Sequence, residues 1–237
     1  MIGWRGKIGM IVPSSNLVLE SESNRLIPSG ISVHFARSKI KRDTSEELET
    51  LAKNAPIEAK KLNDGGVDVI AFGCTTGSLL KGNDYDANII KSIESETDAP
   101  AITTSSAVLS ALREMNVKKI SIATPYEQWL NNRVNEYFKE NNIQVVSSKG
   151  LGKPDPIELS NLEPKHAYKL AREVDHDDAD AVFISCTAFR TIEILEYLEK
   201  DLGKPVISSN QATIWSCLKI LNISSETDGY GSLLSDY

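Results

Sequence analysis

Two of the three cysteines in this chain share one sequence context. Each follows a short apolar run and precedes a threonine, in "FGCTTGS" at residues 72–78 and in "FISCTAF" at residues 183–189. A thiolate can attack a substrate carbon, and a thiol can donate a proton that it later takes back. The matching contexts therefore indicate that Cys74 and Cys186 face each other across one active site.

The spacing around the two cysteines repeats along the chain. Pro13 precedes Cys74 by 61 positions, and Pro125 precedes Cys186 by the same 61 positions, so the repeat offset is 112 residues. An aspartate lies shortly before each cysteine, and "PAITTSSA" matches "PVISSNQA", which lies seven residues closer to its cysteine. Four matches in the same order favour two halves of similar plan. The first half is predicted as residues 1–104 plus 212–237, and the second as residues 105–211.

The elements that must position these residues alternate between strands and helices. Apolar runs rich in β-branched residues predict buried strands, and the amphipathic segments between them predict helices. The predicted strands cover residues 7–13, 67–72, 99–104, 118–124, 143–150, 179–185 and 204–209, and the predicted helices 45–66, 106–116, 126–141, 164–178, 191–203 and 212–221. This order predicts an α/β fold with mostly parallel sheets. Both cysteines fall at carboxyl ends of strands, where functional groups gather in such folds.

Neutral hydrogen-bonding residues surround the first cysteine. Thr75 and Thr76 follow it directly, and Ser14, Ser15 and Asn16 follow the first predicted strand. A helix that opens after a strand presents free N–H groups, which lower the pKa of a thiol and bind carboxylates. The sequence therefore predicts a neutral cradle for a carboxylate or an oxyanion, suited to stabilising an enediolate or a covalent adduct.

Composition excludes several classes of function. The chain has 237 residues, a formal net charge of −7 and a pI of about 5.1, which argues against nucleic-acid and anionic-membrane partners because these require a basic surface. No segment approaches the roughly 20 apolar residues of a membrane helix, and the N-terminus lacks the pattern of a signal peptide. The three cysteines form no disulfide framework, so we expect a cytoplasmic protein.

Other chemically interesting residues fit structural roles better. Cys217 lies in the apolar segment "ATIWSCLKIL" and is interpreted as part of the core. The three histidines lack ligand spacing, so no metal site is expected, and the acidic run at residues 175–180 is interpreted as a solvated loop. Arg190, close to Cys186, fits a substrate carboxylate and a surface acid equally well. No GxGxxG or P-loop motif is present to indicate nucleotide binding.

Six motifs spread over nearly the whole chain carry a family resemblance. They are "GMIVPSSN", "FGCTTGS", "TPY", "SCT" followed by an arginine, "GKPVISSNQA" and the late "GYG". Together they resemble the aspartate/glutamate racemase superfamily, in its branch of maleate cis–trans isomerases and arylmalonate decarboxylases. The resemblance implies two pseudo-symmetric Rossmann-like lobes with the active site in the cleft between them. It also implies no metal, no organic cofactor, a small carboxylate or dicarboxylate substrate, and a homo-oligomer.

The resemblance implies a role for each matching residue. Cys74 takes the position of the nucleophile of the maleate isomerases, and Cys186 takes that of the general acid or base. Tyr126 and Asn16 match residues that bind a substrate carboxylate. The further substrate-binding residues expected from the match and from the repeat are Thr75, Thr76, Thr187 and, more incidentally, Ser14.

Two features depart from the isomerase pattern. Isomerases carry a further asparagine after an "LG" turn, about where this chain has Asp155-Pro156. They also tend to have bulky apolar residues after the first cysteine, whereas "CTTGS" is polar and closer to the decarboxylases. Arylmalonate decarboxylases, however, keep only the second cysteine. Two thiols favour chemistry on both faces of a substrate.

The sequence leaves several functions open. Cis–trans isomerisation of a maleate-like acid, with addition of Cys74 to the substrate, is the first choice. Racemisation of an amino or related acid, or decarboxylation through Cys186, is the alternative. A two-lobed binding module without catalysis is less favoured, because binding alone does not require two symmetric thiols.

Overall fold

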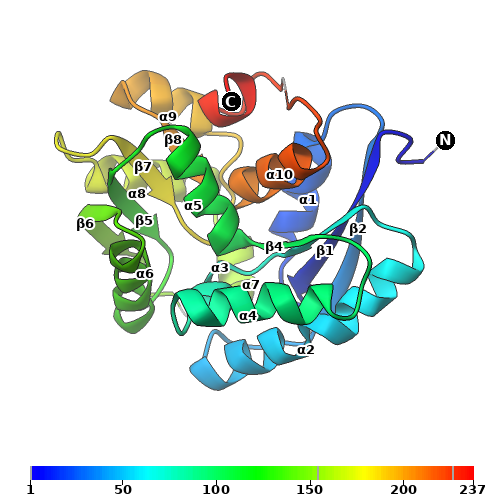
Figure 1. Ribbon diagram of the computed structural model, residues 1–237. Helices are drawn as coiled ribbons and strands as arrows, with labels where there is room; N and C mark the ends of the chain where they lie inside the picture. Colours follow the sequence, from blue (N-terminus) through cyan, green and yellow to red (C-terminus); the bar gives the residue numbers. More distant parts are fainter. Residues whose placement is uncertain (1, 154, 226) are drawn as a thin grey trace.

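The computed structural model describes residues 2–153, 155–225 and 227–237. It contains two four-stranded sheets in which all strand pairings are parallel. The first sheet has the order β2-β1-β3-β4 and the second the order β6-β5-β7-β8 (Figure 1). The strands are β1 Gly6–Pro13, β2 Ile31–Ser38, β3 Val69–Phe72, β4 Ala101–Thr103, β5 Lys119–Thr124, β6 Gln144–Gly150, β7 Ala181–Ile184 and β8 Val206–Ser208. The predicted α/β fold with two lobes of one plan is confirmed.

Helices connect the strands in both lobes, as parallel pairing requires. They are α1 Val18–Leu26, α2 Ser45–Asp64, α3 Thr75–Leu79, α4 Asn83–Glu94, α5 Thr104–Glu114, α6 Gln128–Glu140, α7 Pro156–Ser160, α8 Pro164–Val174, α9 Leu195–Leu202, α10 Ser209–Ile220 and α11 Ser232–Ser235. The sequence-based assignment missed β2, α1, α4 and the short helices α7 and α11. The edge strand β2 is only half-buried along much of its length, so its apolar pattern is interrupted.

The central strands explain the apolar runs in the sequence. All four residues of β3 and all four of β7 are buried. A strand in the middle of a parallel sheet is covered by helices on both faces, so it consists of continuous rather than alternating apolar residues. Each cysteine lies two positions beyond the end of one of these strands, after Gly73 in the first lobe and after Ser185 in the second.

The repeated block "PAITTSSA" and "PVISSNQA" has a structural cause. In each copy a short strand ends in a hydroxyl residue that caps the next helix: Thr103 before α5 and Ser208 before α10. Each forms a reciprocal capping box, the first with Ser106 and the second with Gln211. The repeat therefore encodes a strand-to-helix turn beside each cysteine loop.

The last long helix joins the two lobes. Helix α10 follows β8 of the second sheet, yet it packs against α5, α1, β3 and β4 (Figure 1). The lobe boundaries at residues 104/105 and 211/212 stay a prediction. Within the described ranges, no helix is both long and apolar enough to cross a membrane.

Candidate active site

Both predicted catalytic cysteines line one small cavity, here called the thiol cavity. It lies at the carboxyl ends of β1, β3, β5 and β7, where parallel strands of the two lobes deliver their loops. Its volume is about 20 Å³, enough for about one water molecule. The site is therefore closed in this structure. The lining residues are Pro13, Ser15, Asn16, Asp43, Cys74, Thr75, Thr76, Tyr126, Cys186, Thr187 and Ala188.

The first cysteine loop, residues 73–77, presents its thiol at the start of a helix. Cys74 has extended backbone, with φ −142° and ψ 109°, and is the N-cap of α3. Its Sγ accepts a hydrogen bond from the Gly77 N–H at 3.3 Å and lies 3.8 Å from Thr76 Oγ1. A Cβ at Gly77 would lie 3.0 Å from Sγ, so glycine permits this close approach. The loop thus places N–H and hydroxyl groups around one sulfur.

The second cysteine loop, residues 185–189, holds its thiol differently. Cys186 has φ +98°, in the region that side-chain-bearing residues rarely occupy. Its Sγ accepts a hydrogen bond from the Ala188 N–H at 3.3 Å. The next helix, α9, begins only at Leu195. A local backbone constraint, rather than a helix N-terminus, orients this sulfur.

Burial keeps both thiols protonated in the absence of substrate. Desolvation is the main cause that raises the pKa of Cys74 to about 12, and the nearby Asp43 carboxylate raises it further. The same two causes raise the pKa of Cys186, against lowering by the Ala188 N–H and the Tyr126 hydroxyl. The sequence-based expectation of a lowered thiol pKa at Cys74 is therefore wrong for the closed site, because desolvation outweighs the N–H groups.

Hydrogen bonds between the lobes hold the two cysteine loops together. Asn16 Nδ2 donates to Thr187 Oγ1 at 2.9 Å, and Thr187 Oγ1 donates to the Gly73 carbonyl at 3.2 Å. Ser209 Oγ accepts from Thr75 Oγ1 at 3.0 Å and from the Cys186 N–H at 3.1 Å. Each loop is thus tied to an element of the opposite half.

The predicted carboxylate-binding residues occupy different places around the cavity. Asn16 and Tyr126 are almost fully buried and line it. The Tyr126 hydroxyl lies 3.3 Å from Ser185 Oγ, and burial with the neighbouring Cys186 raises its pKa. Ser14 is not among the lining residues, because its hydroxyl bonds to the N–H and the carbonyl of Ile40. Thr75, Thr76 and Thr187 do line the cavity.

The sequence analysis missed Ser209 and Asp43 at this site, and it named Ser15 only as one of the neutral donors near the first strand. The buried Ser15 hydroxyl lines the cavity without a hydrogen-bond partner among the described residues, so it can donate to a ligand. Ser209 belongs to the repeated block "PVISSNQA", which was recognised as a repeat but was given no role at the site. Asp43 lies in the loop after β2 and contributes the cavity's one carboxylate among the lining residues. The 112-residue offset pairs Asp43 with Asp155, and this match in the sequence could have pointed to Asp43.

Several other predicted positions lie outside the cavity. Arg190 forms an ion pair with Glu193 at 3.2 Å, as expected of a surface residue. Asp155 caps the short helix α7, and the side chain of Pro156 is outside the described part of the chain. Cys217 is fully buried in α10. Across the described residues, no group of three or more His, Cys, Asp or Glu side chains could hold a metal ion.

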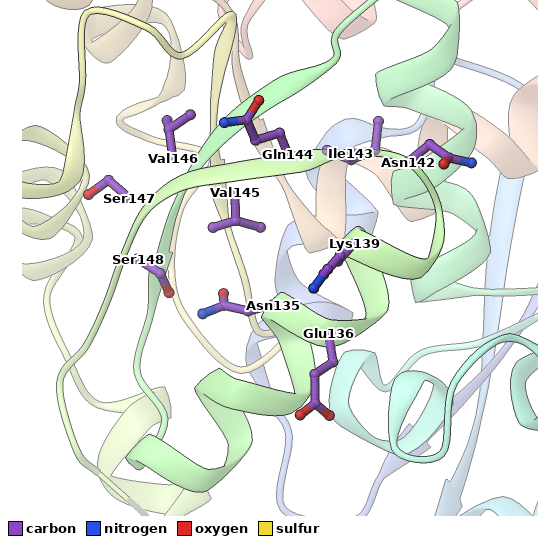
Figure 2. Close-up of a pocket in the computed structure, with 10 residues that line it drawn as sticks. All are labelled: Asn135, Glu136, Lys139, Asn142, Ile143, Gln144, Val145, Val146, Ser147 and Ser148. Atoms are coloured by element: carbon purple, nitrogen blue, oxygen red, sulfur yellow. The ribbon is translucent and has the colours of Figure 1, made fainter.

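Two larger hollows elsewhere contain no cysteine. A surface groove of about 650 Å³ lies along α6 and β6, and Figure 2 shows its lining side chains, which include Glu136 and Lys139 but no cysteine. Another hollow, of about 720 Å³ and here called the outer hollow, is lined by Arg42, Asp43, Thr44, Ser45, Glu127, Trp129 and Asp155. Asp43 is shared by the outer hollow and the thiol cavity.

Comparison with known proteins identifies the family. A model of the arylmalonate decarboxylase family matches residues 8–234. The chain belongs to the arylmalonate decarboxylase family. Among curated relatives of this family member, maleate isomerase of Geobacillus stearothermophilus is 30% identical, with 97% of each chain covered. Arylmalonate decarboxylase of Bordetella bronchiseptica is 25% identical, covering 97% of this chain and 96% of the relative.

A solved structure of a family member has the same fold as this chain. The chain resembles a cysteine-to-alanine variant of the maleate isomerase from Pseudomonas putida S16 with maleate, at 26% identity. The TM-score is 0.92, and 97% of each chain is covered. A variant of arylmalonate decarboxylase in a liganded form matches with a TM-score of 0.90 at 25% identity, so fold and length agree with both kinds of family member.

Proposed function

We propose that this protein is a cofactor-independent cis–trans isomerase of small unsaturated acids of the maleate type. Cys74 is the nucleophile, and Cys186 is the general acid and base. The main observation behind this proposal is that both thiols line one cavity, and most of the other lining residues carry neutral hydrogen-bonding groups. The maleate isomerases among the relatives support the same assignment.

The reaction follows from the placement of the two sulfurs. Cys74 loses its proton to solvent as the substrate binds, and its sulfur adds to one alkene carbon. The π electrons move toward the adjoining carboxylate, and Cys186 delivers a proton to the other alkene carbon. The central bond is now single and rotates. Cys186 then takes the proton back, the C–S bond breaks, and the trans acid leaves.

Neutral donors support the charge that develops during this reaction. Asn16, Tyr126 and the unpartnered Ser15 hydroxyl are assigned to the substrate carboxylate, where negative charge grows after sulfur addition. Thr75, Thr76 and Thr187 contribute further donors at the cysteine loops. Because both thiols are protonated in the closed cavity, the Gly77 N–H and the Thr76 hydroxyl must stabilise the Cys74 thiolate once substrate is present.

Decarboxylation of an arylmalonate is the second candidate. The family model and the Bordetella bronchiseptica relative support it, together with the polar "CTTGS" segment. It requires Cys186 as proton donor and gives no role to Cys74. Racemisation by the paired thiols uses both sulfurs but has no relative of that activity among those described above. The pairing of thiols therefore favours isomerisation.

Proton NMR in D2O tests these reactions in one experiment. Purified protein is incubated separately with maleate, phenylmalonate, aspartate and glutamate. We expect fumarate to form from maleate, with no turnover by Cys74→Ser or by Cys186→Ser. Carbon dioxide loss from phenylmalonate that persists in Cys74→Ser would instead establish the decarboxylase. Fumarate formation at an unchanged rate by Cys74→Ser would contradict the covalent mechanism.

The surroundings of the enzyme are part of the proposal. We place it in the cytoplasm, because three free cysteines, two of them catalytic, need a reducing compartment. We assign it a homo-oligomeric state and no cofactor, and neither nucleic acid nor membrane as partner. Light scattering after size exclusion measures the assembly, and a monomer across micromolar concentrations would contradict the oligomer.

A further inference from the structure

Asp43 is the one charged residue among those that line the thiol cavity. Every other lining side chain is a neutral polar group, a thiol or an apolar group. The cavity therefore offers no lysine or arginine to balance negative charge. A dicarboxylate in this site would bring two negative charges next to the Asp43 carboxylate and the forming Cys74 thiolate.

The Asp43 carboxylate is also free to accept a hydrogen bond. Asp43 is half-buried, and no donor among the described residues forms a hydrogen bond or an ion pair with it. Burial, together with the charge of Glu47, raises the pKa of Asp43 to about 6. The side chain is therefore an ionised, unpartnered acceptor at pH 8.

The approach to the thiol cavity is also negatively charged. Asp43 lines both the thiol cavity and the outer hollow, so it stands where the two adjoin. The charged residues that line the outer hollow are Arg42, Asp43, Glu127 and Asp155, which are one cation and three carboxylates. A singly charged ligand meets less repulsion here than a doubly charged one.

We propose that Asp43 makes the site selective for acids with one carboxylate and a neutral hydrogen-bond donor, such as an amide, at the other end. The inference rests on the proposed isomerase function and narrows its substrate class. The carboxylate of the ligand binds the neutral donors of the cavity, and its amide N–H donates to the Asp43 carboxylate. A second ligand carboxylate at that position finds repulsion instead of a partner.

The test compares maleate with its monoamide, maleamate, at pH 8. We expect kcat/KM of the wild-type protein to be at least about tenfold higher for maleamate, because like charges in close contact weaken binding strongly. Asp43→Asn should shift the ratio toward maleate by at least about tenfold. Glu127→Gln, which removes a carboxylate from the outer hollow only, should change the ratio less than about threefold.

A binding measurement keeps the inference testable without turnover. Succinate and succinamate are the saturated counterparts, and calorimetry with the wild-type protein and with Asp43→Asn gives their affinity ratio. Succinamate should bind more tightly to the wild-type protein, and Asp43→Asn should remove this preference. Equal affinities, or a ratio that Asp43→Asn leaves unchanged, overturn the inference. If the wild-type protein turns over neither maleate nor maleamate but still binds succinamate more tightly than succinate, the isomerase function is contradicted and the selectivity of Asp43 is supported.

Discussion

The two cysteine loops occupy equivalent positions in the repeat, yet they hold their sulfurs by different means. Cys74 has extended backbone at φ −142° and caps a helix, whereas Cys186 has φ +98° and is followed by turns. Both sulfurs accept one backbone N–H at 3.3 Å. Equal spacing thus brings two thiols to one cavity, while unequal loops give them unequal surroundings and support unequal roles.

The supports behind the loops differ in the same way. Neutral hydroxyls hold the first loop: Ser78 Oγ donates to the Cys74 and Thr75 carbonyls, and Ser105 Oγ donates to the Thr75 carbonyl. The second loop depends on a buried carboxylate. Asn210 Nδ2 donates both to the Thr187 carbonyl and to Glu22. Only the second loop is therefore coupled to a titrating group by these contacts.

The largest expected effect concerns the tyrosine beside Cys186. Tyr126→Phe should lower kcat/KM roughly 10- to 1000-fold, because it removes a buried hydroxyl donor that lines the cavity and lowers the pKa of Cys186. Ser14, its partner at the 112-residue offset, bonds to Ile40 instead, so Ser14→Ala should change kcat/KM less than about threefold. Steady-state kinetics of both variants measures the contrast. A loss below twofold in Tyr126→Phe would make the tyrosine structural.

A smaller effect should appear in the pH dependence of stability. Burial raises the pKa of Glu22 from 4.5 to about 7, so the folded state binds this proton more tightly than the unfolded state. The free energy of unfolding should therefore fall as pH rises from about 4.5 to about 7, by up to about 3 kcal/mol from this group. Above about pH 7 the loss is complete.

Glu22→Gln tests this coupling by removing the titration. Its amide oxygen can still accept the Thr191 and Ile192 N–H groups. Its new amide group faces the Asn210 Nδ2 donor, and an Asn210 flip that turns Oδ1 toward it gives up the bond to the Thr187 carbonyl, a cost that is the same at both pH values. In denaturant titrations, the free energy of unfolding of Glu22→Gln minus that of wild type should be more favourable at pH 8 than at pH 5. Glu20→Gln, on the exposed face of the same helix, is the control. The same stability difference at both pH values would refute the role of Glu22.

The smallest effect separates the two backbones directly. Glycine at Cys186 relieves the positive φ, whereas glycine at Cys74 relieves nothing. Both substitutions remove a buried thiol, so Cys186→Gly should be less destabilising than Cys74→Gly by about 1–2 kcal/mol. Urea unfolding of the matched pair measures the difference. Equal destabilisation would show that the backbone at Cys186 carries no strain.

The sequence predicted the repeated features of the molecule and missed those without an obvious counterpart. Cys74, Cys186 and the two capping blocks repeat in order, so parallel strand topology alone brings them to one place. Asp43 follows an edge strand whose half-buried pattern gave no strand signal, so its loop could not be placed. The pKa of Cys74 was mispredicted because the desolvation of a closed cavity depends on packing from both lobes, which spacing does not contain.

Intact-protein mass spectrometry of the two cysteine variants tests the central claim of unequal thiols most directly. After incubation with saturating maleate, Cys186→Ser should gain the mass of one maleic acid, located at Cys74 by peptide mapping. In this variant the carbon next to the carboxylate takes its proton from water instead of from Cys186, and the adduct accumulates because no thiolate at position 186 removes that proton again. Cys74→Ser should gain nothing. An adduct on Cys186 in Cys74→Ser, or no adduct in either variant, would contradict the assignment of Cys74 as nucleophile and Cys186 as acid and base.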